Sequence, residues 1–221
     1  MTSHEASDPR RPPHLDTLSG MIEIELAEFV LPPEEPGGLL ARWVDIAIAS
    51  RVIEPFSMAL ATANAQGRPS NRTVLVKKVT ASAVEFVTTA TSAKGRDLEE
   101  NPWAAIVAYW RETRQQLRFS GPVERLSDAE ADEVFSLRPI AAQASAIASH
   151  QSEPLEDYAE LRARADRLAQ SPAPLPRPPA WNCYRLAPET IEFWHGSVDR
   201  LHRRLVYART PEGWQHRLLN P

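Results

Sequence analysis

The chain has 221 residues, a formal net charge of −4 and a sequence pI near 5.9. This length is enough for one domain with a sizeable core, and the acidic balance argues against nucleic acid or an anionic membrane as the main partner. No apolar run reaches the length of a membrane span, and no signal-peptide pattern opens the chain, so we expect a cytoplasmic protein. Because Cys183 is the single cysteine, the chain cannot form an internal disulfide, and we expect Cys183 to be a buried strand residue.

The first part of the chain differs in composition from the rest. Residues 1–20 are rich in Ser, Pro, Asp and Arg and show no apolar period, and we assign residues 1–36 to a mobile N-terminal tail. We assign residues 37–221 to a single domain. It begins with a helix over 39–52, in which the apolar spacing places Trp43 in the core.

Short apolar and β-branched runs predict most of the remaining elements. The early strands are expected at 58–63, 69–79, 84–89, 103–110 and 115–125, and the last four at 182–186, 190–195, 201–209 and 214–218. Three helices are expected between them: one from the capping box of Ser127 and Glu130 to about Leu137, an alanine-rich piece after Pro139, and one over 155–170. Many strands with short links indicate a mainly β, α+β fold with an antiparallel barrel rather than a parallel α/β sheet.

The stretch 71–101 carries the strongest functional signal. A hairpin of two strands is followed by a short helix that Thr91 or Ser92 can cap. Hydroxyls, cations and free backbone N–H groups at a helix start suit a phosphate. All three lysines of the chain, Lys77, Lys78 and Lys94, lie here. A solvated edge strand guarded by lysines explains that clustering equally well on spacing alone.

Ordered short motifs extend this signal over most of the chain. They read RTVLVK at 72–77, FVT at 86–88, TSAK at 91–94, RQQ at 114–116, SLRP at 136–139, HQS at 150–152, and IEFW at 191–194 with RLHRR at 200–204. Together they resemble the pyridoxine/pyridoxamine 5'-phosphate oxidase family. The resemblance implies an FMN-binding, Greek-key split β-barrel with flanking helices, usually a homodimer with FMN at the subunit interface.

The resemblance also implies a set of FMN contacts. Carried over position by position, these are Arg72, Val74, Lys77, Val87, Thr88, Ser92, Lys94, Gln116, Gln151, Ser152, Trp194 and Arg204. Ala93 stands where the family usually has Arg, and Val87 where it often has Tyr, so we expect weaker but not abolished phosphate binding. Arg72 and Lys77 are an odd number of residues apart, which requires contact with different parts of the cofactor or a bulge between them.

On the substrate side, the resemblance implies Lys77, Arg138, Arg200 and His202 as binding residues, with Arg200 and His202 at the catalytic position. Two hydroxyl-bearing positions of the vitamin oxidases read Val134 and Ala142 here, which should weaken binding of a substrate phosphate. Arg138 and the Arg200/His202 pair could instead clamp a carboxylate on a flat ring.

A nearer likeness fits that pattern. KGRDL at 94–98, NPWA at 101–104, YWRET at 109–113 and QSE at 151–153 resemble the phenazine-biosynthesis flavin oxidases, a branch of the same family. Lys77 departs from that branch. The expected reaction is dehydrogenation of a reduced phenazine carboxylic acid by FMN, with dioxygen reoxidising the flavin and giving hydrogen peroxide.

Two alternatives stay open. The first is a pyridoxine/pyridoxamine 5'-phosphate oxidase with the same fold, and the second is a flavin-binding protein without oxidation chemistry of its own. His202 on its own would be an ordinary surface histidine after a turn. The histidines have no metal-ligand spacing, so we expect no metal site.

Overall fold

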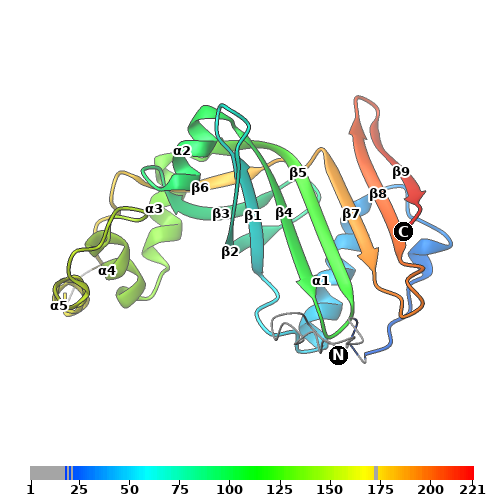
Figure 1. The fold of residues 1–221 in the computed structure, drawn as a ribbon, viewed down its shortest axis with the longest axis horizontal. Helices are drawn as coiled ribbons and strands as arrows, with labels where there is room; N and C mark the ends of the chain where they lie inside the picture. The colour runs from blue at the N-terminus through cyan, green and yellow to red at the C-terminus, as the bar shows by residue number, and fades with distance from the viewer. Residues whose placement is uncertain (1–17, 19, 21, 172–173) are drawn as a thin grey trace, which may run out of the picture.

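The computed structural model describes residue 18, residue 20, residues 22–171 and residues 174–221 (Figure 1). Its helices are η1 (Ala27–Phe29), α1 (Pro36–Ala49), α2 (Ala93–Glu100), α3 (Asp128–Ser136), α4 (Ile140–Ala148) and α5 (Tyr158–Ala169). Its strands are β1 (Ser57–Ala63), β2 (Pro69–Val79), β3 (Val84–Thr89), β4 (Trp103–Trp110), β5 (Gln115–Arg125), β6 (Trp181–Leu186), β7 (Thr190–His195), β8 (Arg203–Thr210) and β9 (Gly213–Leu219).

The strands form one antiparallel sheet that closes on itself. Their order is β4-β1-β2-β3-β6-β5-β7-β8-β9, and an additional pairing of β4 with β5 closes the first six strands into a barrel. Strands β7, β8 and β9 continue the sheet outward from β5, and helices α3, α4 and α5 form a lobe on the opposite side (Figure 1). The predicted α+β split barrel is confirmed.

The long strand β5 holds the architecture together. Residues 115–122 pair with β4 and residues 115–120 with β7, whereas the last residues, from Val123 to Arg125, pair with β6. With eleven residues, β5 is long enough to pair with three other strands. The outer strands β7, β8 and β9 are therefore joined to the barrel through β5.

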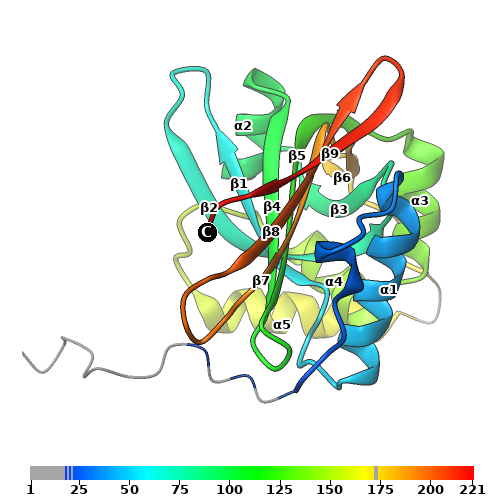
Figure 2. The same ribbon diagram turned by 90° about the vertical axis from the view of Figure 1, so that its right-hand side faces the viewer.

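Helix α1 lies against the barrel (Figure 2), and its Leu39, Leu40, Trp43 and Ala47 belong to the main hydrophobic core. Trp43 is fully buried and meets Phe193 of β7 edge-on at 5.1 Å, which confirms its predicted core position. The segment before α1 also contributes, because Leu26 and Phe29 belong to the same core. Glu28 is buried and accepts a hydrogen bond from the Trp43 indole.

The predicted tail of residues 1–36 thus includes residues that pack on the barrel, while residues 1–17, 19 and 21 lie outside the described residues. Helix α1 begins at Pro36 and ends at Ala49, three residues earlier at each end than expected. The starts of α5 and β8 also differ from the sequence prediction. Helix α5 begins at Tyr158 because the Asp157 side chain caps it, and β8 begins at Arg203 because a tight loop precedes it. Each of the last two differences reflects a local side chain to backbone hydrogen bond that competes with regular structure.

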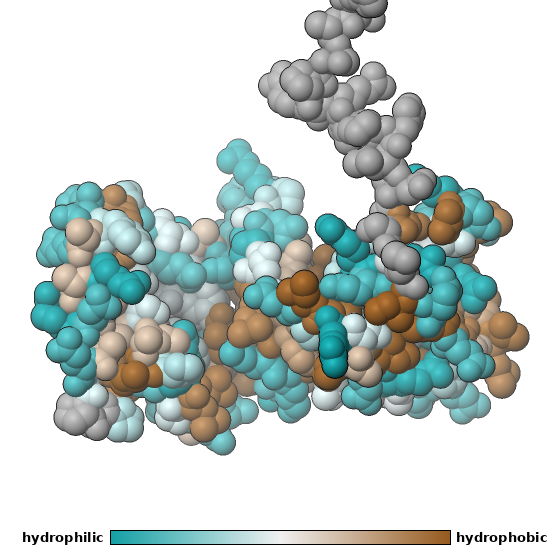
Figure 3. Space-filling model, turned by 90° about the horizontal axis from the view of Figure 1, so that it is seen from below, coloured by the Kyte–Doolittle hydropathy of each residue, from teal (hydrophilic) through white to brown (hydrophobic). Residues whose placement is uncertain are grey.

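Exposed apolar side chains are distributed unevenly. Figure 3 shows hydrophobic side chains gathered in patches over the barrel part of the lower face, while the helical lobe at the left is more polar. Large exposed hydrophobic residues on the strands are Leu75, Trp103, Tyr109 and Leu218. Within the described part of the chain, no helix combines the length and apolar character needed to cross a membrane.

Candidate active site

The first group of site residues gathers between β3, α2 and the loop after α4. The ammonium of Lys94 lies 3.2 Å from Thr88 Oγ1, 3.2 Å from Gln151 Oε1 and 3.5 Å from Ser92 Oγ. Thr88, Ser92 and Lys94 are all buried. We call Thr88, Ser92, Lys94 and Gln151 the lysine cluster. Its cation has only neutral oxygens as partners among the described residues, an arrangement suited to an incoming anion.

Local sequence explains how the lysine cluster forms. Ser92 caps α2, as predicted, and its hydroxyl accepts a hydrogen bond from the Gly95 backbone N–H at 3.2 Å. Gly95 lets the helix lie directly on the end of β3, because a Cβ there would stand 2.4 Å from the Ala90 carbonyl oxygen. Burial, with the nearby charge of Arg72, lowers the pKa of Lys94.

The neighbouring loop is held in an uncommon backbone conformation. Ser152 has φ +73°, in the left-handed region that non-glycine residues seldom adopt. Its hydroxyl accepts a hydrogen bond from the Ala93 backbone N–H at 3.2 Å, at the start of α2. Strain of this kind often accompanies binding sites, and here it places Gln151 against Thr88 and Lys94.

Arg72 lies beside the lysine cluster, but its donors are engaged. Its guanidinium donates to Thr62 Oγ1 at 2.7 Å, Ser70 Oγ at 2.5 Å and the Leu60 carbonyl, and it pairs with Asp97 at 3.6 Å. Asp97 also accepts a hydrogen bond from Thr62. The sequence analysis assigned no role to Asp97, although it lies in the KGRDL segment, because its partners Thr62 and Arg72 are distant in sequence.

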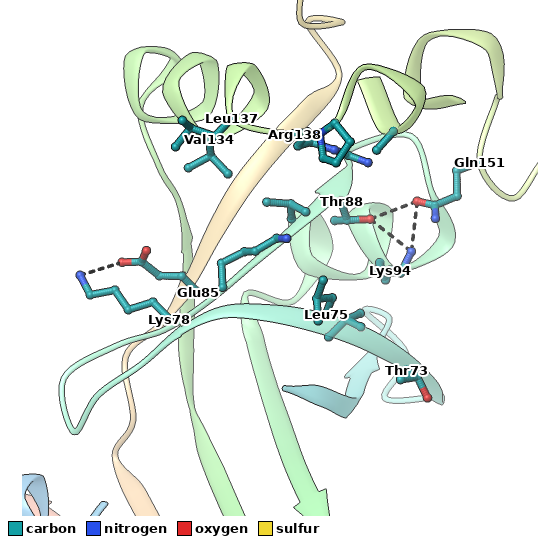
Figure 4. A pocket seen from close by; sticks show the side chains of 15 residues that line it. Thr73, Leu75, Lys78, Glu85, Thr88, Lys94, Val134, Leu137, Arg138 and Gln151 are labelled. Carbon is teal, nitrogen blue, oxygen red and sulfur yellow. Dashed lines mark hydrogen bonds and ion pairs between the residues drawn. The ribbon is translucent and has the colours of Figure 1, made fainter. Parts of the chain in front are cut away.

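A pocket of about 730 Å³ opens beside the lysine cluster (Figure 4). Lys94, Thr88 and Gln151 converge on it from one side, and Arg138 projects toward it from the helical lobe. Val74 and Val87 line it as well, and so do Val134, Leu137 and Ala142. The pocket therefore joins the expected cofactor residues of the barrel to the expected substrate residue Arg138.

Lys77 reaches this pocket because strand β2 is irregular. Val76 pairs with Phe86 while Lys78 pairs with Glu85, so Lys77 is the extra residue of a β-bulge. The bulge was one of the two arrangements that the spacing of Arg72 and Lys77 required. Lys78, the adjacent lysine, is paired with Glu85 at 3.6 Å.

The second group lies on β5, β7 and the start of β8. Gln116 is the cross-strand partner of Trp194, which in turn pairs with Arg204. The His202 ring lies 4.8 Å from the Trp194 ring. We call Gln116, Trp194, His202 and Arg204 the tryptophan strip. Arg204 donates to Glu192 Oε1 at 2.7 Å.

The loop before β8 presents Arg200 and His202. Arg200 is exposed and has φ +68°, and Asp199 steadies the turn by accepting a hydrogen bond from the Leu201 N–H at 3.0 Å. His202 Nδ1 accepts a hydrogen bond from the Ser197 backbone N–H at 3.1 Å. A neutral His202 must then carry its proton on Nε2, which makes that atom a donor.

The two groups occupy different parts of one protomer. The lysine cluster belongs to β3 and α2, and the tryptophan strip belongs to the outer strands, on the other side of the barrel in Figure 1. The residues that line the pocket beside Lys94 include none of the tryptophan strip. The resemblance implied one site built across a subunit interface, and within a single protomer the two groups lie apart.

Comparison with known proteins decides the family. Residues 44–171 match the family model for pyridoxamine 5'-phosphate oxidase, and residues 181–221 match the C-terminal dimerisation region of pyridoxine 5'-phosphate oxidase. The chain belongs to the pyridoxamine 5'-phosphate oxidase family. The second match covers β6 to β9, so most of the tryptophan strip lies in the family's dimerisation region.

Relatives within the family carry two different activities in their names. A dihydrophenazinedicarboxylate synthase of Pseudomonas chlororaphis is 43% identical over 206 residues, 93% of each chain. A pyridoxine/pyridoxamine 5'-phosphate oxidase of Burkholderia multivorans is also 43% identical, over 85% of this chain and 89% of its own. Overall identity therefore does not separate the two activities.

A solved family structure has closely similar geometry. PhzG from Burkholderia lata 383, in complex with tetrahydrophenazine-1-carboxylic acid, superposes with a TM-score of 0.87 and 43% identity, over 91% of this chain and all of that one. An FMN-binding protein of Nostoc punctiforme, 21% identical with a TM-score of 0.68, shares the fold.

Proposed function

We propose that this protein is an FMN-dependent oxidase that dehydrogenates a reduced planar heterocyclic carboxylic acid, of the dihydro- or hexahydrophenazine carboxylate type, in phenazine biosynthesis. The observation that carries the proposal is Arg138, a cation without an acidic partner among the described residues, at the apolar wall of the pocket beside the lysine cluster. The likeness to the dihydrophenazinedicarboxylate synthase and to PhzG supports the same substrate class.

The residues fit FMN at both ends. In the lysine cluster, an unpaired buried ammonium with two hydroxyls beside it suits the terminal phosphate, and Lys77 at the bulge is placed to meet the ring system. Gln116, Trp194 and Arg204 would complete the site from a second subunit, which accounts for their distance from the lysine cluster. The dimerisation region and the exposed apolar side chains of the strands support such a homodimer.

When bound, FMN would accept the two electrons removed from the substrate and pass them to dioxygen, which gives hydrogen peroxide. The chain supplies binding and orientation. Arg138 would hold the substrate carboxylate, and Arg200 would face the substrate from the partner's loop. His202 would donate a hydrogen bond through Nε2, since its Nδ1 already accepts one from Ser197.

Oxygen uptake separates this proposal from its main alternative, a pyridoxine/pyridoxamine 5'-phosphate oxidase. Lys77 and the 43% identity to the Burkholderia multivorans enzyme favour that alternative. We expect dioxygen consumption and hydrogen peroxide with a reduced phenazine carboxylic acid, and at least tenfold lower kcat/KM with pyridoxine 5'-phosphate. The reverse preference would overturn the assignment, and a purified protein that takes up no FMN would overturn the whole proposal.

A further inference from the structure

Arg138 has an unusual setting for an arginine. Its guanidinium carbon lies 5.1 Å from the centroid of the Trp181 ring and 5.9 Å from that of Phe135, and the two rings meet at 5.1 Å in an edge-on arrangement. Both rings are almost fully buried. Among the described residues, no acidic side chain pairs with the guanidinium. Aromatic rings therefore take the place that a carboxylate usually fills.

The backbone around Arg138 is also fixed. Gln143 is 3% exposed, and its amide nitrogen donates to the Arg138 carbonyl at 2.8 Å and to the Ser136 carbonyl at 3.2 Å. Its amide oxygen accepts a hydrogen bond from the Leu175 N–H at 3.1 Å. The turn between α3 and α4 is thereby tied to the segment that leads into β6.

Arg177 fixes the Phe135 and Trp181 rings relative to each other. Arg177 donates to the Trp181 carbonyl at 2.6 Å and pairs with Asp128 and Asp132 of α3 at 3.0 and 2.5 Å. Phe135 belongs to α3 and Trp181 begins β6. Because Arg177 fixes these two elements against each other, the aromatic surface under Arg138 has one defined orientation.

Contact with the rings leaves the N–H edge of the guanidinium as the part that can meet a ligand. The pocket residues nearest to it in sequence, Val134, Leu137 and Ala142, carry no hydrogen-bond donors on their side chains. One guanidinium edge satisfies both oxygens of a carboxylate, whereas a phosphate monoester has three terminal oxygens and needs further donors. Among the side chains of α3, α4 and the turn between them that line this pocket, Arg138 is the one hydrogen-bond donor, which matches a carboxylate; Ser145 and Ser149 line a separate, smaller cavity that Arg138 also borders.

We propose that Trp181 and Phe135 are positioning residues that fix the plane of Arg138, and that this end of the pocket selects a ring carboxylate over a phosphate monoester. The inference rests on the proposed function in taking the pocket as the substrate site. It adds how the site selects the acid group: Trp181 and Phe135 act through Arg138 and do not touch the acid group themselves.

Binding measurements on the FMN-loaded protein test the positioning role. The probes are phenazine-1-carboxylate and unsubstituted phenazine, compared in the wild type, Trp181→Leu and Trp181→Phe. We expect the wild type to prefer the acid at least tenfold, Trp181→Leu to lose most of that preference, and Trp181→Phe to retain most of it. Binding of unsubstituted phenazine should stay within about twofold throughout, which a general disruption of the pocket would not produce.

Two further variants make each failure informative. Trp214→Leu removes a ring from under another arginine, Arg209 at 4.5 Å, and should leave the acid preference intact. Arg138→Gln should abolish the preference. If Arg138→Gln abolishes it and Trp181→Leu keeps it, the positioning proposal is wrong while the proposed function stands; if Arg138→Gln keeps it, the acid-binding role in the proposed function is wrong.

The selectivity can also be tested without disturbing the buried rings. Val134→Tyr with Ala142→Ser adds two hydroxyls at half-buried positions of the pocket. We expect the double variant to bind pyridoxal 5'-phosphate at least tenfold more tightly than the wild type and to prefer the phenazine acid less. An unchanged affinity for pyridoxal 5'-phosphate in a folded, FMN-loaded double variant would overturn the selection argument.

Discussion

The lysine cluster and the loop that carries Arg200 and His202 are held in different ways. Lys94 is 8% exposed and has three oxygen partners from β3, the α2 cap and the 151 loop. Arg200 is exposed in a left-handed turn. The first group is complete within one folded protomer, whereas the second presents its side chains outward. The contrast suggests that cofactor binding and turnover can be disrupted separately.

The largest expected effect is on the loop. Arg200→Ala should reduce kcat/KM for the reduced phenazine acid by about a thousandfold, on the order of 4 kcal/mol, because the proposed function places this charge against the reacting ring. FMN content, measured from the visible spectrum, should be unchanged. Arg203→Ala, a change at a nearby exposed arginine, is the control and should retain activity. Full turnover in Arg200→Ala would remove the loop from the mechanism.

The next effect is on the lysine cluster. Lys94→Met should weaken FMN binding by about 10- to 100-fold, because one charge-assisted hydrogen bond is worth about 1.5–3 kcal/mol. Lys78→Met is the matched control, since Lys78 is paired with Glu85 and should not affect FMN affinity. Fluorescence titration with FMN measures both. Equal losses in the two variants would mean that the phosphate is bound elsewhere.

A third expected effect concerns stability beneath the tryptophan strip. Burial, with the charges of Arg114 and Arg203, lowers the pKa of His195 to about 4 from its ordinary 6.5. Between these values the unfolded chain binds a proton that the native protein does not, so the free energy of unfolding falls as the pH drops from 6.5 to 4. With allowance for partial exposure, the loss is about 2 kcal/mol.

Urea unfolding across this pH range, compared between the wild type and His195→Gln, isolates the contribution of His195. The variant cannot titrate at this position, so its unfolding free energy should fall less steeply toward pH 4. Parallel pH profiles for the two proteins would show that His195 is not held neutral in the native state.

The smallest expected effect is the pH dependence of FMN affinity. The pKa of Lys94 is lowered from its ordinary 10.5, so its ammonium loses its proton at a lower pH than a free lysine. FMN affinity should fall as the pH rises through that lowered pKa, by no more than the loss caused by Lys94→Met. The variant should lack this part of the pH dependence. A wild-type pH profile identical to that of Lys94→Met would contradict the role of Lys94.

The sequence predicted most of the fold because its local signals agree with the tertiary structure. The hairpin before α2, the Ser92 cap and the capping box of Ser127 are all confirmed. Strand order was beyond local signals, since nothing in β5 shows that its two ends pair with different strands. The motifs identified Lys94 and Arg138, but their settings depend on contacts distant in sequence. Asp97 and Trp181 were missed for that reason. Asp97 pairs with Arg72 and Trp181 contacts Arg138, and in both cases the two residues are too far apart in sequence to form a local pattern.

The β-bulge at Lys77 has a consequence for how this pocket could change. The bulge adds a single residue to β2, between the pair of Val76 with Phe86 and the pair of Lys78 with Glu85. Deleting residue 77 would in principle leave a continuous ladder and an intact barrel, while withdrawing one positive charge from the cavity. Insertion or deletion of one residue in β2 would therefore add or remove this positive charge while the barrel is kept. Two family members with different substrates could then differ at this position by a single codon.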